Sequence, residues 1–145
     1  MSAATWTEED GMAILVGYVP RAEGRAALRR GAEEARLRQT KLVVINSNRG
    51  GRDLDEKEAA RHEQELAEVR AELDREGLEH EVRQLVRGNE PADDLIAVAE
   101  EIGADFIVIG LRRRTPVGKL IMGSNAQRIL LEAPCPVLAV KAEED

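Results

Sequence analysis

The sequence predicts an α/β fold, a single domain built on an open parallel five-stranded sheet with helices on both faces. Five short apolar runs alternate along the chain with four stretches of helical periodicity, as expected when helices connect parallel strands. The length of 145 residues suits one domain, and 43% hydrophobic with 34% charged residues is a globular balance. In such sheets a ligand binds beyond the carboxyl ends of the strands, so the loops after them are searched first.

Four of the apolar runs are continuous and rich in β-branched residues, which is typical of strands buried on both faces. They are Met12–Val19, Lys41–Asn46, Asp105–Gly110 and Pro136–Lys141. The remaining run, Glu79–Val86, alternates more between polar and apolar residues. That pattern predicts a strand nearer an edge of the sheet, with one face less covered.

Four stretches between these runs have the spacing of amphipathic helices. In Gly24–Arg38 the shared face holds Ala27, Leu28, Gly31 and Ala35, and in Pro91–Gly103 it holds Leu95, Ala99 and Ile102. The mostly charged stretch Asp53–Glu76 carries a thin stripe of Leu66, Val69 and Leu73. The last helix is expected from about Gly123 to Glu132, with Ile129, Leu130 and Ala133 buried. The loop "SNRGGRD" (Ser47–Asp53) is expected to be flexible.

The composition excludes several classes of function. A net charge of −7 and 2% aromatic residues argue against nucleic acid as a partner. Cys135 is the single cysteine, so neither an intrachain disulfide nor a thiolate metal cluster is available. His62 and His80 lack a metal-ligand spacing, and we expect both to be surface residues. No apolar run reaches membrane-spanning length and the N-terminus does not resemble a signal peptide, so we expect a cytoplasmic protein without membrane association.

Motifs for catalysis and for phosphate loops are missing or incomplete. The turn "GYVPRAEG" does not carry the glycine pattern of a dinucleotide-binding fold, and "RRTPVGKL" departs from a P-loop at both ends. The acidic pairs Asp93–Asp94 and Glu100–Glu101 diverge on a helix, and we expect them to be solvated. We therefore expect no catalytic residues and no metal ligands, and a protein that is not an enzyme.

The stretch "GLRRRTPVGKLIMGSNAQ" (Gly110–Gln127) is the best candidate for an anion site. Gly123–Ser124 opens the final helix, and a helix N-terminus offers free N–H groups and a positive dipole end. The cations of the stretch are Arg112, Arg113, Arg114 and Lys119. Two interpretations remain open: the stretch binds phosphate, or Ser124 caps its helix while the arginines only keep the surface soluble.

Three segments that span nearly the whole chain resemble the universal stress protein (UspA-like) family. They are "AILVGYVPRAEGRAALRRGAEEARLRQTKLVVIN", "GNEPADDLIAVAEEIGADFIVIG" and "GKLIMGSNAQRILLEAPCPVLAVK". The resemblance implies a family domain over residues 12–142, preceded by a disordered or flexible tail over residues 1–11. It also implies the strand order 3-2-1-4-5 of a Rossmann-like, adenine nucleotide alpha hydrolase-like fold.

Members of this family that bind ATP carry Gly, two residues, Gly, nine residues, then Gly-Ser or Gly-Thr. Gly110 and Gly123–Ser124 match the first and last positions in register, whereas Arg113 replaces the second glycine. Val19 takes the position after the first strand where the family usually has an Asp that contacts the nucleoside. Arg113 either binds a phosphate or occupies its place, and we favour phosphate binding.

The resemblance implies an adenine nucleotide, ATP or AMP, at the carboxyl ends of the first and fourth strands, with Mg²⁺ accompanying ATP. The residues expected at this site are Gly17, Tyr18, Val19, Asn46, Ser47, Ile109, Gly110, Leu111, Arg112, Arg113, Lys119, Gly123, Ser124, Asn125 and Ala126.

The resemblance also implies a homodimer formed by antiparallel pairing of the last strand, and a short apolar strand near the C-terminus suits such an edge. The interface residues expected are Pro136, Val137, Leu138, Ala139 and Val140. Two functions are compatible with these features. The first is a nucleotide-binding homodimer in the stress response, without dedicated catalysis beyond a slow ATPase activity that we do not favour. The second is a nucleotide-free dimer that acts through an unknown protein partner.

Overall fold

The computed structural model describes residues 13–50, 55–112 and 122–142. Its sheet has five strands, all parallel, in the order β3-β2-β1-β4-β5. Their bounds are β1 Ala13–Gly17, β2 Lys41–Asn48, β3 His80–Val86, β4 Phe106–Leu111 and β5 Val137–Lys141. The predicted fold class and strand order are confirmed.

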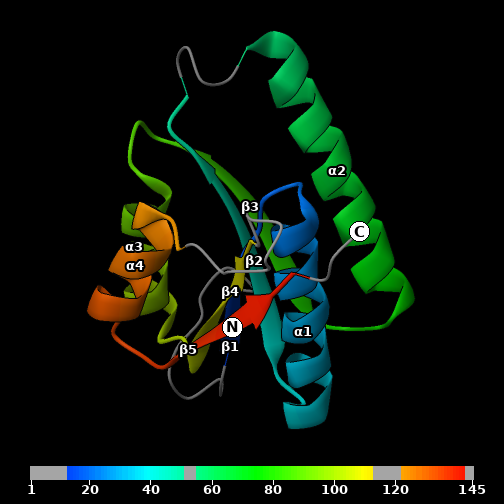
Figure 1. Cartoon of the computed structure of the whole chain (residues 1–145). Helices are drawn as coiled ribbons and strands as arrows, with labels where there is room; N and C mark the ends of the chain where they lie inside the picture. The colour runs from blue at the N-terminus through cyan, green and yellow to red at the C-terminus, as the bar shows by residue number, and fades with distance from the viewer. Residues whose placement is uncertain (1–12, 51–54, 113–121, 143–145) are drawn as a thin grey trace.

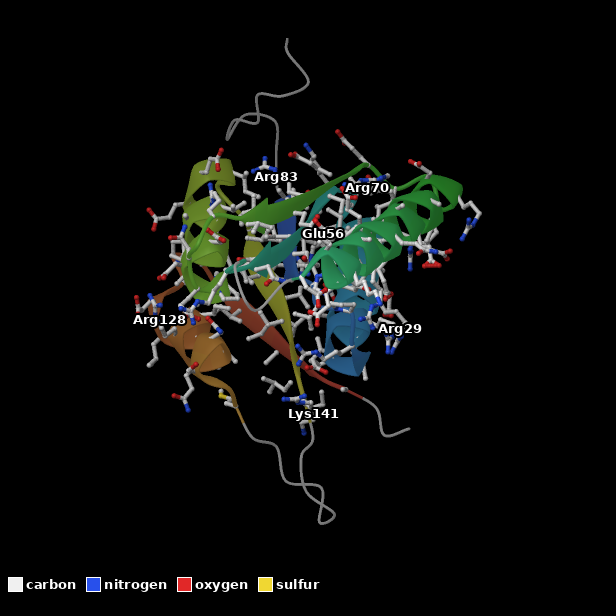
Figure 2. All side chains as sticks on the ribbon, turned by 90° about the horizontal axis from the view of Figure 1, so that it is seen from above. Arg29, Glu56, Arg70, Arg83, Arg128 and Lys141 are labelled. Atoms are coloured by element: carbon white, nitrogen blue, oxygen red, sulfur yellow. The ribbon has the colours of Figure 1, made fainter. Side chains whose placement is uncertain are left out.

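Helices cover both faces of the sheet, with α1 and α2 on one side and α3 and α4 on the other (Figure 1). Their bounds are α1 Ala22–Arg38, α2 Glu56–Arg75, α3 Pro91–Ile102 and α4 Ser124–Glu132. The view from above shows the same three layers (Figure 2). No helix within the described ranges is long and apolar enough to cross a membrane.

Side-chain alternation along the strands divides the core into two halves. On β1, Ile14 and Val16 join the cluster under α1 and α2, whereas Ala13 and Leu15 join the cluster under α3 and α4. The same parity on β2 puts Leu42 and Val44 in the first cluster and Val43 and Ile45 in the second. Beyond Ile45, Asn46 therefore belongs to the α1/α2 side and Ser47 to the α3/α4 side.

Several local expectations need correction. The strand after Lys41 continues through Ser47 and Asn48, which pair with β3, so these two residues are not part of a flexible loop. β5 lies at an edge of the sheet, where Val137, Leu138, Ala139 and Val140 are half-buried and Lys141 is exposed, because one of its edges lacks a neighbouring strand in the described part of the chain. Leu130 is 38% exposed, since the short α4 presents mainly Ile129 to the core. β3 lies at the opposite edge, as predicted.

Candidate functional site

A cavity of about 820 Å³ opens at the carboxyl ends of β1, β2 and β4. Every predicted nucleotide-site residue in the described part of the chain lines it. These are Gly17, Tyr18, Val19, Asn46, Ser47, Ile109, Gly110, Leu111, Arg112, Gly123, Ser124, Asn125 and Ala126. Arg113 and Lys119 lie outside the described residues. The volume is within the range of small-molecule sites.

The N-terminus of α4 forms one wall of this cavity. Gly123 is the N-cap residue, with φ −73° and ψ 167°, and none of the described side chains caps the helix. Ser124 is the first helical residue, so the interpretation that it is the helix cap is wrong. The first amides of the helix have no partner within it, and they carry the positive end of its dipole. This wall of the cavity favours an anion.

Packing among the described residues gives no reason for Gly123 to be glycine. Its φ is open to any residue, and a Cβ built on it would meet no atom of those residues within 4 Å. The space beside the helix end therefore stays free for a close approach to the backbone.

Gly110 and Gly24, by contrast, are required by packing. A Cβ on Gly110 would lie 1.9 Å from the carbonyl oxygen of Glu23, and one on Gly24 would lie 1.8 Å from that of Val19. The start of α1 thus packs directly against the ends of β1 and β4. The carboxylate of Glu23 is also 3.9 Å from Nε of Arg112, which holds that cation beside the cavity mouth.

Asn46 lies at the carboxyl end of β2 and is only 2% exposed. Its Nδ2 donates to the carbonyl oxygen of Tyr18 at 3.0 Å, whereas its Oδ1 is buried and has no hydrogen-bond partner among the described residues. Tyr18 is itself fixed, because its backbone N–H donates to the carbonyl oxygen of Ile45 at 2.9 Å. Burial, together with the charge of Glu65, raises the pKa of Tyr18, so its hydroxyl stays neutral.

Behind the cavity lies a fully partnered polar cluster centred on Asp94, which is 1% exposed. Its carboxylate accepts from Ser47 Oγ at 2.6 Å, from Arg87 at 2.9 Å and from Asn89 Nδ2 at 3.1 Å. Burial raises the pKa of Asp94, but these three hydrogen bonds outweigh it and hold the pKa below its usual value. The expectation that Asp94 is solvated is wrong, because its partners come from β2 and from the segment between β3 and α3.

A second set of contacts joins the two helices on this side of the sheet. Oδ1 of Asn125 accepts from the backbone N–H of Ala92 at 2.9 Å, so a side chain of α4 satisfies the first turn of α3. Arg128 of α4 pairs with Asp93 of α3, and Figure 2 labels this arginine where the two helices meet. The α4 N-terminus is therefore held in place at the cavity.

The first turns of α2 supply a wall that the sequence analysis missed. The cavity-lining residues there are Glu58, Arg61, His62 and Glu65. Nδ1 of His62 is buried and has no hydrogen-bond partner in the part of the chain that the structure describes. His80 is also not a surface residue: its side chain is 13% exposed and its Nδ1 lies 2.7 Å from the carbonyl oxygen of Leu78.

Residues suited to metal binding do not gather anywhere in the described part of the chain: no group of three or more His, Cys, Asp or Glu is close enough to hold an ion. Cys135 is half-buried, and burial, with the nearby charge of Asp105, raises the pKa of its thiol. The thiol is therefore mostly protonated near neutral pH and a weak nucleophile.

Comparison with known proteins gives consistent results. The model of the Universal stress protein family matches residues 12–141. A "Universal stress protein" of Mycolicibacterium smegmatis is 45% identical over 128 residues, covering 88% of this chain and 96% of that protein.

Solved structures of similar proteins agree. A universal stress protein from Archaeoglobus fulgidus is 40% identical with a TM-score of 0.75, over 90% of this chain and 99% of that chain. A structure of the universal stress protein from Archaeoglobus fulgidus in complex with dAMP is 35% identical with a TM-score of 0.69, over 90% of this chain and 98% of that one. The chain belongs to the universal stress protein family.

Proposed function

We propose that this protein binds an adenine nucleotide, AMP or ATP, in the cavity at the carboxyl ends of β1 and β4. The observation that carries the proposal is the uncapped N-terminus of α4, which opens on the cavity beside a glycine with no packing role. A helix end of this kind, with free amides and the dipole aligned, is a general site for phosphate.

The rest of the cavity suits a nucleoside. Gly123, Gly110, Gly17, Tyr18 and Asn46 all line the cavity, and we place the phosphate at α4 and the base near the end of β2. Arg112 is 40% exposed at the mouth, where it adds a positive charge next to the phosphate position. The complex of the Archaeoglobus fulgidus protein with dAMP, at 35% identity, supports the choice of an adenine nucleotide.

The proposed role in the cell is that of a binding protein in the stress response, without dedicated catalysis. The fraction of protein with bound nucleotide would then follow the nucleotide concentration and signal it to protein partners. The nucleotide would dissociate without being hydrolysed. Incubation of the protein with ATP and Mg²⁺, followed by a phosphate-release assay, tests this point. Turnover that rises with protein concentration, and that Gly123→Asp abolishes, would contradict a purely binding role.

We also propose a homodimer through β5. The carbonyl oxygen of Pro136 accepts from the N–H of Ile107, and the N–H of Ala142 donates to the carbonyl oxygen of Leu111. The backbone groups of the even-numbered residues in this segment therefore face β4. By the alternation of a parallel strand, the N–H groups of Val137, Ala139 and Lys141 then face away from β4. These groups suit an antiparallel pairing between two copies, and Figure 2 labels Lys141 at the end of the strand. Light scattering coupled to size exclusion should give a dimer mass for wild type and a monomer mass for Ala139→Pro, which removes one outward donor.

Calorimetric titration tests the nucleotide proposal. AMP, dAMP and ATP are expected to bind, and adenosine more weakly by about tenfold because it has no phosphate at the helix end. ATP is titrated with and without Mg²⁺. Absence of heat and of any thermal shift with all three nucleotides at millimolar concentration would refute the proposal. Equal affinity for adenosine and AMP would refute the phosphate position.

A further inference from the structure

Two helix N-termini reach the cavity. Glu90 and Pro91 at the start of α3 line it, as do Gly123 and Ser124 at the start of α4. In neither helix does the side chain of the N-cap residue bond to the first turn. Free amides and a dipole end would make both positions suitable for an anion, so the difference between them decides where a phosphate is bound.

The first turn of α3 has no amide left for a ligand. Pro91 lacks an N–H, and those of Asp93 and Asp94 donate to the carbonyl oxygen of the N-cap residue at 3.0 Å and 3.3 Å. The N–H of Ala92 donates to Oδ1 of Asn125, a side chain of α4, at 2.9 Å. The turn also carries two carboxylates, which disfavour an anion beside it. The N-terminus of α3 is therefore closed.

The first turn of α4 is open. The N–H of Gln127 is the first to donate to the N-cap carbonyl oxygen, at 3.1 Å. The amides of Ser124, Asn125 and Ala126 precede it and have no acceptor among the described residues. No acidic residue occurs in this turn. Of the two helix ends described at the cavity, the one that offers its amides to a phosphate is that of α4.

Asn125 connects the closed helix end to the open one. Its backbone N–H is one of the open amides of α4, while its Oδ1 holds the first turn of α3. The side-chain amide is fixed in this orientation, because a flip would turn Nδ2 towards the N–H of Ala92, donor against donor. Few other described contacts fix α4. Ile129 is its single buried residue, and the pair of Arg128 with Asp93 lies at the surface (Figure 2), where ion pairs contribute little.

We propose that Asn125 is a positioning residue of the nucleotide site. By capping α3 from α4, its side chain closes the first helix end and fixes the direction of the open amides at the second. Binding groups contribute fully only when they are held within a fraction of an ångström of the bound geometry. The side chain thus acts through Ala92 and sets the part of the affinity that comes from the phosphate. This inference rests on the proposed nucleotide function and adds to it the contact that orients the phosphate end.

A variant of Asn125 separates positioning from stability. Asn125→Ala removes the acceptor and introduces a residue that favours a helix. Titration calorimetry with AMP and adenosine is expected to show AMP bound about fivefold more weakly than by wild type, with adenosine unchanged. A merely structural role would lower the melting temperature and leave the ratio of the two affinities as it is. Gln127→Ala, which removes an exposed amide side chain from the same helix, is the matched control and keeps the wild-type ratio.

A measurement on the wild type keeps the test valid even if the variant fails to fold. If the bond between Asn125 and Ala92 favours the bound phosphate, the bound phosphate favours that bond by the same factor. Hydrogen exchange of the Ala92 amide is therefore expected to be about fivefold slower at saturating AMP than at saturating adenosine.

The outcomes distinguish this inference from the proposed function. An unchanged ratio of AMP to adenosine affinity in folded Asn125→Ala, or Ala92 exchange that is equal with the two ligands, would overturn the positioning role while nucleotide binding stands. If wild type binds no AMP, the proposed function falls and the inference with it. If wild type binds AMP and adenosine equally, the phosphate position and the inference fall together.

Discussion

The two glycines at the ends of the β4–α4 connection serve different purposes. Gly110 is in contact with α1, where a Cβ would collide with the backbone of Glu23, whereas Gly123 faces open space at the start of α4. Two polar side chains differ in the same way. The carboxylate of Asp94 accepts three hydrogen bonds behind the cavity, whereas Oδ1 of Asn46 accepts none from the described residues. One part of the site region is filled and satisfied by the protein itself. The other faces the cavity without such contacts among the described residues.

The largest effect is expected from Gly110→Ala, which tests the close packing of β4 against the start of α1. The new methyl group would lie 1.9 Å from a backbone oxygen that cannot rotate away, so α1 must shift from β4. We expect a loss of about 3 kcal/mol in the free energy of unfolding. Denaturant unfolding measures it, with Gly123→Ala as the matched control that should change stability by less than about 1 kcal/mol. Equal losses in the two variants would contradict the distinction between the glycines.

Asp94→Ala is expected to cost about 2 kcal/mol, because Ser47, Arg87 and Asn89 lose a shared acceptor. The cost is moderated by the exposure of Arg87, whose side chain can turn to water. Thermal and denaturant unfolding measure the loss. A stability within error of wild type would show that this cluster does not hold β2 to α3.

The pH dependence of the same site has a defined sign. The pKa of Asp94 is lowered in the folded state, so its stabilising contribution is fully present above the unfolded value of about 4 and is lost as pH falls through the folded-state pKa. The stability difference between wild type and Asp94→Asn is therefore expected to be constant near neutral pH and to shrink below about pH 4. A difference that grows with acidification would contradict the lowered pKa.

Gly123→Asp changes the N-terminus of α4 at the cavity. It is expected to lower nucleotide affinity while raising the free energy of unfolding. Its carboxylate caps α4 and interacts well with the dipole, so the free energy of unfolding should rise by about 0.5 kcal/mol. The same negative charge occupies the proposed phosphate position, and AMP affinity should fall at least about tenfold. Calorimetry and denaturant unfolding on one preparation give both values. A variant that binds AMP as wild type does would exclude the helix end as the phosphate site.

His62→Phe is expected to have the smallest effect. The substitution keeps a ring of similar size and removes Nδ1, the second unpartnered atom of the cavity. If this nitrogen contacts the ligand, AMP affinity falls about fivefold while the melting temperature does not fall. Glu63→Gln, on the exposed side of α2, is the control for a general effect of changing that helix. An unchanged affinity in His62→Phe would remove His62 from the binding wall.

The fold was predictable because its signals are local. Continuous β-branched runs marked the central strands, and helical spacing marked Leu66, Val69 and Leu73, all of which are buried. Strand order followed from family resemblance alone, since pairing between β1 and β4 joins segments far apart in the chain.

The site was predicted in its outline and missed in its polar details. The sequence pattern predicts a solvated Asp94 because its partners Ser47, Arg87 and Asn89 all lie outside its own helix, although Asp94 precedes Val98 by one helical turn on the buried face of α3. His62 likewise lies one turn before Leu66 on the buried stripe of α2. Reading polar residues within apolar stripes as candidates for buried sites would have found both.

We propose that the cavity holds a nucleotide with its phosphate at α4 and its base near the end of β2. The most direct measurement is an amide chemical-shift titration with AMP, with inorganic phosphate as the comparison. AMP should shift the backbone amides of Ser124, Asn125 and Ala126 together with the side-chain amide of Asn46, whereas phosphate should shift only the α4 group. If neither the α4 amides nor the Asn46 amide shifts at saturating AMP, or if the shifted amides lie elsewhere on the protein, this placement of the nucleotide is contradicted.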